Sequence, residues 1–302
     1  MSIPDDRAPL VEPPANFQAS FGQPPAPAFA PAAAIDPNNP PWGIAAAILT
    51  WVGSVALLIL MATLFAITSI PKSILGDQEK IKQFLTTDPK AIFIQVLSFI
   101  PAHLLTLFIV WAVVTRLGKR PFWKSLGWSW GKGFGFWRSI GLAIGLFLVG
   151  FLLLYFIGSV NTQFDQSVSS SRATSIVIAF LAVGTAPLVE ETVYRGVLYS
   201  ALHKKLGVYW AVIGVLVLFT LVHVPQYWPD FARIGVLGLL SLSLTFVRAY
   251  TGRLLPCFII HFVFNGVQSA LIIIEPYLPK SITGQEPKAP AMLISYLIHK
   301  LL

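Results

Sequence analysis

The stretch APLVEETVYRGVLYSAL, residues 186–202, places two carboxylates and an arginine inside a long apolar run. Similar apolar runs precede and follow it along most of the chain. An ionisable side chain at the centre of a bilayer costs at least about 2.5–3.5 kcal/mol on insertion scales, and such groups usually have a function. Glu190, Glu191 and Arg195 are therefore the first candidates for a functional site within a membrane.

The composition is typical of a membrane protein. The 302 residues are 55% hydrophobic and only 11% charged, whereas a soluble domain carries roughly 25% charged residues. The net charge of +8 could indicate nucleic-acid binding, but the basic residues lie between apolar runs, as in loops that face anionic headgroups. We therefore expect a lipid bilayer as partner and no nucleic acid. No nucleotide motif is recognised, so no organic cofactor is expected.

Apolar runs long enough to cross a bilayer core of roughly 30 Å predict an all-α fold, a polytopic membrane helix bundle of about eight transmembrane helices. The runs lie at about residues 43–70, 91–115, 137–160, 174–203, 208–224, 231–250, 254–274 and 288–302. We predict three parts: a disordered cytoplasmic tail rich in proline and alanine at 1–41, N-terminal transmembrane helices at 42–170, and a catalytic transmembrane domain at 171–302.

The basic residues predict the orientation. The loop at 116–138 carries six basic residues and no acidic one, and loops of this kind remain in the cytoplasm. The loop at 71–90, expected outside, carries four lysines and disagrees mildly. We place both termini in the cytoplasm, with the multi-pass protein in a bacterial inner membrane. Arg248 and Arg253, at the end of a later span, are interpreted as cytoplasmic anchors.

The three charges near residue 190 do not have the same explanation. Glu191 and Arg195 are four residues apart, so they can form an ion pair across one helical turn. Such a pair could simply lock two helices together. Glu190 points about 100° away around the helix and has no local partner. A carboxylate without a partner needs a metal or a second polar group, so we interpret the cluster as functional.

Two later apolar runs supply further polar side chains. The stretch LFTLVHVPQYW contains His223, and IIHFVFNGV contains His261 and Asn265 one turn apart on a single helix face. A lone histidine on an apolar helix is more often a packing residue than a ligand. At a rise of about 1.5 Å per residue, however, all three lie at depths that overlap with that of Glu190. The coincidence predicts one site built from three helices.

Two kinds of hydrolytic chemistry use these residues. Two histidines and a glutamate are a common set of ligands for catalytic zinc, with an open position for water. Glu190, His223 and His261 are the candidate ligands, and zinc is the expected metal. Without a metal, Glu190 and His223 would activate water as a general base, while His261 and Asn265 would stabilise an oxyanion. Both versions predict hydrolysis of a peptide bond within the membrane.

The motifs resemble those of the CPBP family, also called the Abi or CAAX-protease-like family, which includes the type II CAAX prenyl proteases. That family has EExxxR on one transmembrane helix, FxxxH on the next and HxxxN or HxxxD on a later one. Here the motifs begin at Glu190, Phe219 and His261, in the family's order. Tyr194 replaces the phenylalanine that commonly precedes the arginine. The resemblance covers about residues 174–274.

The resemblance implies an intramembrane endopeptidase whose substrate is a membrane-associated protein or peptide. It implies water activation or metal binding by Glu190 and His223, and ligation or oxyanion stabilisation by His261 and Asn265. Glu191 and Arg195 would support the site. Two other classes remain as alternatives: a non-catalytic bacteriocin-immunity or scaffold membrane protein, and a proton-coupled transporter. The inverted repeats with broken helices that are typical of transporters are not seen in the sequence.

Two more residues carry expectations. His103 is interpreted as a packing or water-lining residue. Pro187 lies three residues before Glu190, and a proline inside a helix removes a backbone donor and frees a carbonyl group. We therefore expect a kink in the helix that carries the two glutamates.

Overall fold

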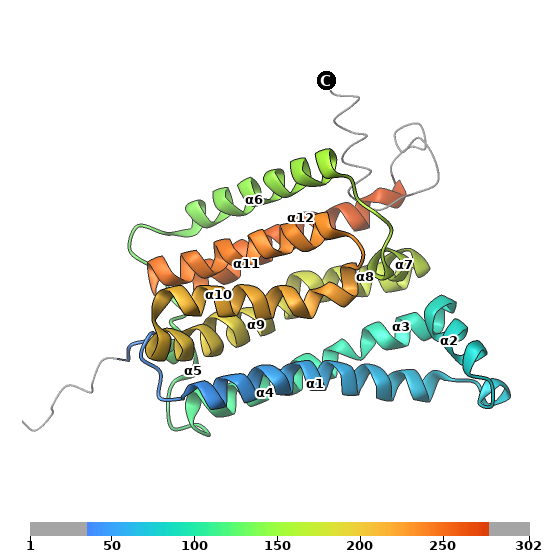
Figure 1. The fold of residues 1–302 in the computed structure, drawn as a ribbon, viewed down its shortest axis with the longest axis horizontal. Helices are drawn as coiled ribbons and strands as arrows, with labels where there is room; N and C mark the ends of the chain where they lie inside the picture. Colours follow the sequence, from blue (N-terminus) through green and yellow to red (C-terminus); the bar gives the residue numbers. More distant parts are fainter. Residues whose placement is uncertain (1–34, 278–302) are drawn as a thin grey trace, which may run out of the picture. The chain divides into compact units, whose positions relative to one another are not determined.

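The computed structural model describes residues 35–277, and within this range every regular element is helical (Figure 1). The all-α prediction is confirmed for this part of the chain. Most of the tail predicted at 1–41 and the whole of the span predicted at 288–302 lie outside the described residues.

Several helices coincide with the apolar runs. They are α1 (Ile44–Ser69), α3 (Pro89–Leu97), α4 (Phe99–Thr115), α6 (Phe136–Ile157), α8 (Arg172–Phe180), α10 (Tyr199–Tyr227), α11 (Phe231–Thr251) and α12 (Leu255–Ile274). Short helices join them: α2 (Gln78–Thr87), α5 (Phe122–Leu126), α7 (Gln163–Ser170) and α9 (Ala186–Glu190). Two π-helical segments, η2 (Leu181–Thr185) and η3 (Glu191–Leu198), lie on either side of α9.

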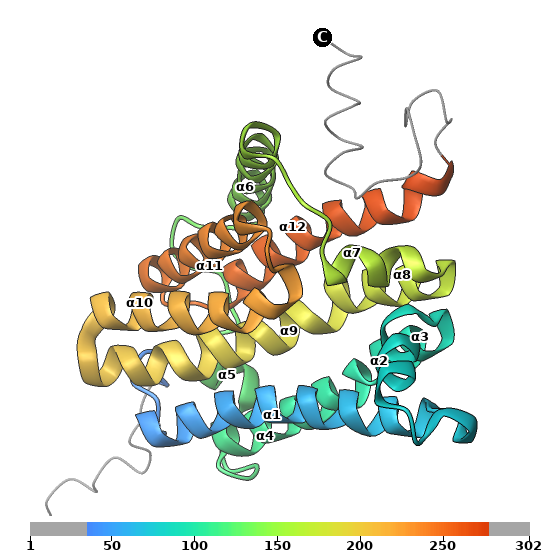
Figure 2. The ribbon, with the colours of Figure 1, turned by 45° about the vertical axis from the view of Figure 1, so that its right-hand side comes forward.

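Six helical stretches among the described residues are long and apolar enough to cross a membrane. This number indicates a multi-pass membrane protein, but it does not confirm the expected eight spans. One stretch, Arg172–Tyr227, is 56 residues long and is broken at Gly207, where φ is 81°. A positive φ suits glycine because it has no Cβ. The chain turns back at this point in both views (Figures 1 and 2), so this stretch contains two helices.

The basic loops meet at one end of the helices. The Leu254 N–H donates to Gly127 O at 2.9 Å, which joins the 116–138 loop to the turn before α12. Lys204 Nζ donates to Pro40 O at 2.8 Å, so residues just before α1 lie at the same end. The interpretation of Arg248 as an anchor in the cytoplasm was wrong, because its side chain is fully buried. The assignment of this end to the cytoplasm remains a prediction, as does the bacterial inner membrane.

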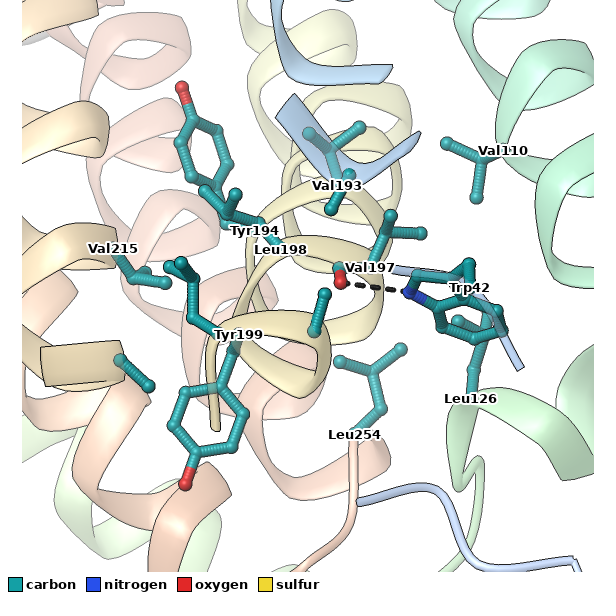
Figure 3. Packing of buried hydrophobic residues seen from close by; sticks show 14 of the residues in the cluster. Trp42, Val110, Leu126, Val193, Tyr194, Val197, Leu198, Tyr199, Val215 and Leu254 are labelled. Carbon is teal, nitrogen blue, oxygen red and sulfur yellow. Dashed lines mark hydrogen bonds between the residues drawn. The ribbon is translucent and has the colours of Figure 1, made fainter. Parts of the chain in front are cut away.

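The segment that carries the glutamates packs on all sides. It packs against α1, α4, α10 and α12 (Figure 2), and its Arg195 side chain reaches α11 through hydrogen bonds. Val193, Val197 and Leu198 are buried at 1% exposure or less. Trp42 points at this segment from the chain before α1 and donates its Nε1–H to Val197 O at 3.0 Å (Figure 3). Helices on both sides of the division predicted at residue 170 thus hold the segment, and that division remains a prediction.

Candidate active site

Glu190 ends a short α-helix that lies between two wider turns. The π-helical segments η2 and η3 flank α9, which is only five residues long. π-Helical turns are rare and are frequent at functional sites. The apolar pattern of the sequence predicted a helix here but did not reveal its wide turns.

Pro187 accounts for the first wide turn. In η2 the Ala186 N–H donates to Leu181 O, five residues back. The next bond of this series would run from residue 187 to Ala182 O, but proline has no N–H. Asn265 of α12 supplies the missing donor, with its Nδ2 at 2.9 Å from Ala182 O. Pro187 therefore frees a carbonyl group, as expected, and this carbonyl ties α12 to the helix of the glutamates.

The predicted ion pair between Glu191 and Arg195 is present. Arg195 Nη1 lies 3.0 Å from Glu191 Oε1, and both side chains are completely buried. The remaining guanidinium donors are bound by α11: Nη2 donates to Ser241 O and Oγ, and Nε donates to Thr245 Oγ1. Sequence analysis missed these two hydroxyl residues. Their signal was two hydroxyls four residues apart, and therefore on one face, in an apolar helix.

His261 lies between the two glutamates. Its Nδ1 is 2.8 Å from Glu191 Oε1, and its Nε2 is 3.7 Å from Glu190 Oε2. A carboxylate accepts hydrogen bonds, so the buried Nδ1 donates to Glu191. The distance to Glu190 is longer than a direct hydrogen bond. Glu191 therefore orients the imidazole, and the opposite nitrogen is directed to Glu190.

The two glutamates differ in access. The Glu190 side chain is 22% exposed, whereas that of Glu191 is not exposed at all. Within the described part of the chain, Glu191 Oε2 is buried without a hydrogen-bond partner. Glu190 is consequently the carboxylate that water or a substrate can reach, and Glu191 is the one that acts through its neighbours.

His223 is held by its own helix. Its Nδ1 lies 2.8 Å from Phe219 O, and a carbonyl only accepts, so Nδ1 donates and a neutral ring has Nε2 as its acceptor. The Phe219 ring connects it to the site: it packs against the rings of His223 and His261, with centroids 4.6 and 6.2 Å away, and lies 4.8 Å from the Arg195 guanidinium. The predicted cooperation of His223 with Glu190 remains a prediction.

The candidate zinc ligands do not form a ready-made set. Among residues 35–277, no three side chains of the His, Cys, Asp and Glu types are grouped so that they could hold a metal ion. The Nδ1 atoms of His261 and His223 bind Glu191 and Phe219 O, so a metal would have to be coordinated by the two Nε2 atoms. As placed among the described residues, Glu190, His223 and His261 do not form a preassembled set of zinc ligands, and zinc remains a prediction from the sequence.

His103 approaches the same region from α4. Its side chain is 7% exposed, and its Nδ1 lies 2.8 Å from Thr185 Oγ1 at the end of η2. The Phe99 ring packs edge-on against the imidazole at 6.1 Å between centroids. These contacts fit the interpretation of His103 as a packing residue between two helices.

Comparison with known protein families gives one result for this region. A family model described as "Type II CAAX prenyl endopeptidase Rce1-like" matches residues 172–267. The match begins with the first residue of α8 and contains all three motifs. No curated protein and no solved structure matches the chain.

Proposed function

Residues 172–267 form a domain of the Rce1-like type II CAAX prenyl endopeptidase family, and on this premise we propose that the protein hydrolyses a peptide bond within the membrane through Glu190. The observation that carries the proposal is the position of His261, whose ring is bound by buried Glu191 on one side and is directed to accessible Glu190 on the other. A purely structural ion pair would not require the second glutamate.

The buried part of the site orients His261. Glu191 accepts from Nδ1, and Arg195 compensates the charge of Glu191. The hydrogen bonds that Arg195 donates to Ser241 and Thr245 fix the position of its guanidinium. A carboxylate bound to one ring nitrogen sets the tautomer of a histidine and stabilises its protonated form. His261 Nε2 is thereby prepared to accept and return a proton on the side of Glu190.

Glu190 acts as the general base. Its partly exposed carboxylate accepts a proton from a water molecule as that water attacks the carbonyl carbon of the substrate. The nearby His261 Nε2 shares this proton and returns it to the departing amine. Asn265 uses one amide hydrogen for Ala182 O, and because its amide group has two, the second can donate to the oxyanion of the tetrahedral intermediate.

The substrate is proposed to be a membrane-associated protein or peptide. The name of the family points to prenylated chains with a CAAX terminus. The predicted spans surround the site, which favours a substrate that already lies in the lipid phase. A farnesylated CAAX peptide is therefore the first probe to use.

The test compares the full-length wild type with Glu190→Gln, both reconstituted in lipid vesicles, on a farnesylated CAAX peptide that carries a fluorophore and a quencher. Removal of a general base lowers the rate by roughly 10²–10⁴-fold, and thermal unfolding should stay unchanged because the substitution is nearly isosteric. Glu79→Gln, on the exposed face of α2, is the matched control and should cleave at the wild-type rate. Equal cleavage by the wild type and Glu190→Gln would refute the proposal and favour the scaffold alternative.

The same assay separates the two chemical versions. Zinc binding would require His223 Nε2 to come together with Glu190 and His261 Nε2, which do not form a preassembled set with it among the described residues. A loss of cleavage after treatment with a chelator, restored by added zinc, would support that version. Undiminished cleavage would support the general-base version, which uses the side chains as they are placed.

A further inference from the structure

Arg248 is a completely buried arginine that the proposed chemistry does not use. It lies in the last turn of α11, and each of its three nitrogens donates a hydrogen bond. Nε donates to Arg195 O at 3.1 Å, Nη1 to Asn38 Oδ1 at 2.7 Å and Nη2 to Pro37 O at 3.2 Å. Its guanidinium also lies 5.3 Å from the centre of the Tyr199 ring. Arg248 thus joins the chain before α1 to the segment that carries the glutamates.

The Arg195 carbonyl needs this donor because of the second wide turn. At the end of η3 the Tyr199 N–H donates to Tyr194 O, five residues back. The α-helix that follows uses four-residue spacing between donor and acceptor, so we expect its first donor to bind Gly196 O. Because the hydrogen-bond spacing changes here from five residues to four, the backbone donors of this helix pass over Arg195 O. Buried carbonyls are almost always paired, and here Arg248 Nε provides the partner.

The two wide turns on either side of Glu190 are therefore held in the same way. Asn265 of α12 binds the carbonyl that η2 releases, and Arg248 of α11 binds the carbonyl that η3 releases. Asn265 belongs to the proposed site. Arg248 touches no reacting group, but the residue whose carbonyl it binds, Arg195, is the ion-pair partner of Glu191.

We propose that Arg248 is a positioning residue that keeps η3 wide, and thereby holds Arg195 and Glu191 in register with His261. The segment 36–42 takes part in this set of hydrogen bonds, because Pro37 and Asn38 bind the other two nitrogens of Arg248. The effect on catalysis rests on the proposed function; the effect on the backbone does not.

An arginine is required at this position. The three acceptors come from two separate segments, Pro37–Asn38 and Arg195, and the planar fork of a guanidinium reaches them at once. A lysine has the same charge but a single nitrogen on a flexible stem. Because all its donors lie on one atom, we expect it to bind one of the two segments and to leave the other unbound. Arg248→Lys is therefore the informative variant, since it keeps the charge but removes the simultaneous hydrogen bonds to the two segments.

The first arm of the test measures hydrogen–deuterium exchange of the full-length protein in lipid vesicles. In Arg248→Lys, the amides of residues 191–200 should exchange roughly 5- to 10-fold faster, as the loss of about one buried hydrogen bond implies. Asn38→Ala should raise exchange in the same peptides by less. Arg116→Gln is the matched control: Arg116 also binds this segment, at Pro41 O, but donates no hydrogen bond to η3 among the described residues, so residues 191–200 should exchange as in the wild type.

Two results of this arm would overturn the proposal. One is wild-type exchange at residues 191–200 in Arg248→Lys. The other is an equal increase in all helices, including α6, which would mean that Arg248 only stabilises the fold.

The second arm measures cleavage of the farnesylated CAAX peptide. Arg248→Lys should lower kcat by about tenfold to a hundredfold, the cost of a small misplacement in an active site, with KM unchanged. A higher KM with unchanged kcat would contradict a positioning role. If the wild type does not cleave the peptide, the proposed function fails, while the exchange arm still decides whether Arg248 holds the wide turn.

Discussion

Two clusters of charged side chains in this protein differ in how many of their carboxylate oxygens have hydrogen-bond or ion-pair partners. We call them the site cluster (Glu190, Glu191, Arg195 and His261) and the loop cluster (Asp165, Asp230 and Arg233). In the loop cluster Arg233 lies 2.6 Å from Asp165 and 3.1 Å from Asp230. Both aspartates also accept backbone N–H groups, those of Thr162, Val160 and Arg233. In the site cluster, one buried oxygen of Glu191 has no partner among the described residues, and Glu190 is partly exposed.

The difference follows from where each cluster lies in the chain. Asp230 caps the first turn of α11, and Asp165 lies in the first turn of α7, where backbone N–H groups have no partner within the helix. Glu190 and Glu191 lie in the middle of a helical stretch, where the backbone donors are already used. Their carboxylates can therefore bind only side chains, water or substrate. A buried carboxylate at a helix start is readily stabilised; one in mid-helix retains the capacity to react.

The largest effect is expected for Arg195→Met in the site cluster. Removing one partner of a buried ion pair lowers the free energy of unfolding by about 3–5 kcal/mol. Cleavage should also fall, by roughly 10²-fold or more, because His261 loses the fixed carboxylate that orients it. Chemical unfolding in detergent and the peptide assay measure the two effects. Arg253→Met, at the end of the same bundle but in neither cluster, is the control.

Arg233→Met applies the same change to the loop cluster. It leaves two buried aspartates without their cation, so the free energy of unfolding should again fall by about 3–5 kcal/mol. The folded protein should keep the kcat of the wild type, since among the described residues no hydrogen bond or ion pair joins this cluster to the site cluster. Arg138→Met, an exposed arginine at the start of α6, should change neither quantity. A reduced kcat in Arg233→Met would show that the two clusters are coupled.

The smallest effect is expected for Glu191→Gln. Glutamine keeps an oxygen that accepts from Arg195 but removes the negative charge, so the free energy of unfolding should fall by about 1–3 kcal/mol. Cleavage should fall by less than in Glu190→Gln, because the general base is still present. Asp165→Asn is the matched change in the loop cluster and should lower stability to a similar extent with full activity. A greater loss of cleavage in Glu191→Gln than in Glu190→Gln would reverse the roles of the two glutamates.

Much of the site could be predicted because it depends on spacing along single helices. Four-residue spacing gave the pair of Glu191 and Arg195, and a proline gave the free carbonyl near Glu190. The contacts of His261 and His223 could not be predicted in this way. Sequence analysis left Glu190 to face both histidines; in the structure His261 lies between the two glutamates, whereas His223 binds Phe219 O. Which partner a side chain takes depends on how neighbouring helices are rotated, and spacing along one helix does not contain that information.

The sequence by itself determined that this is an all-helical membrane protein and predicted polar groups from three helices at similar depth, because apolar length and helical periodicity are local properties. Only the tertiary structure decided the wide turns around Glu190 and the partners that hold them. Arg248 shows the reason. As one basic residue at the end of an apolar run it looked like a surface anchor, yet it is buried because two segments, one about 50 residues and the other about 210 residues away in sequence, present acceptors that only packing brings together.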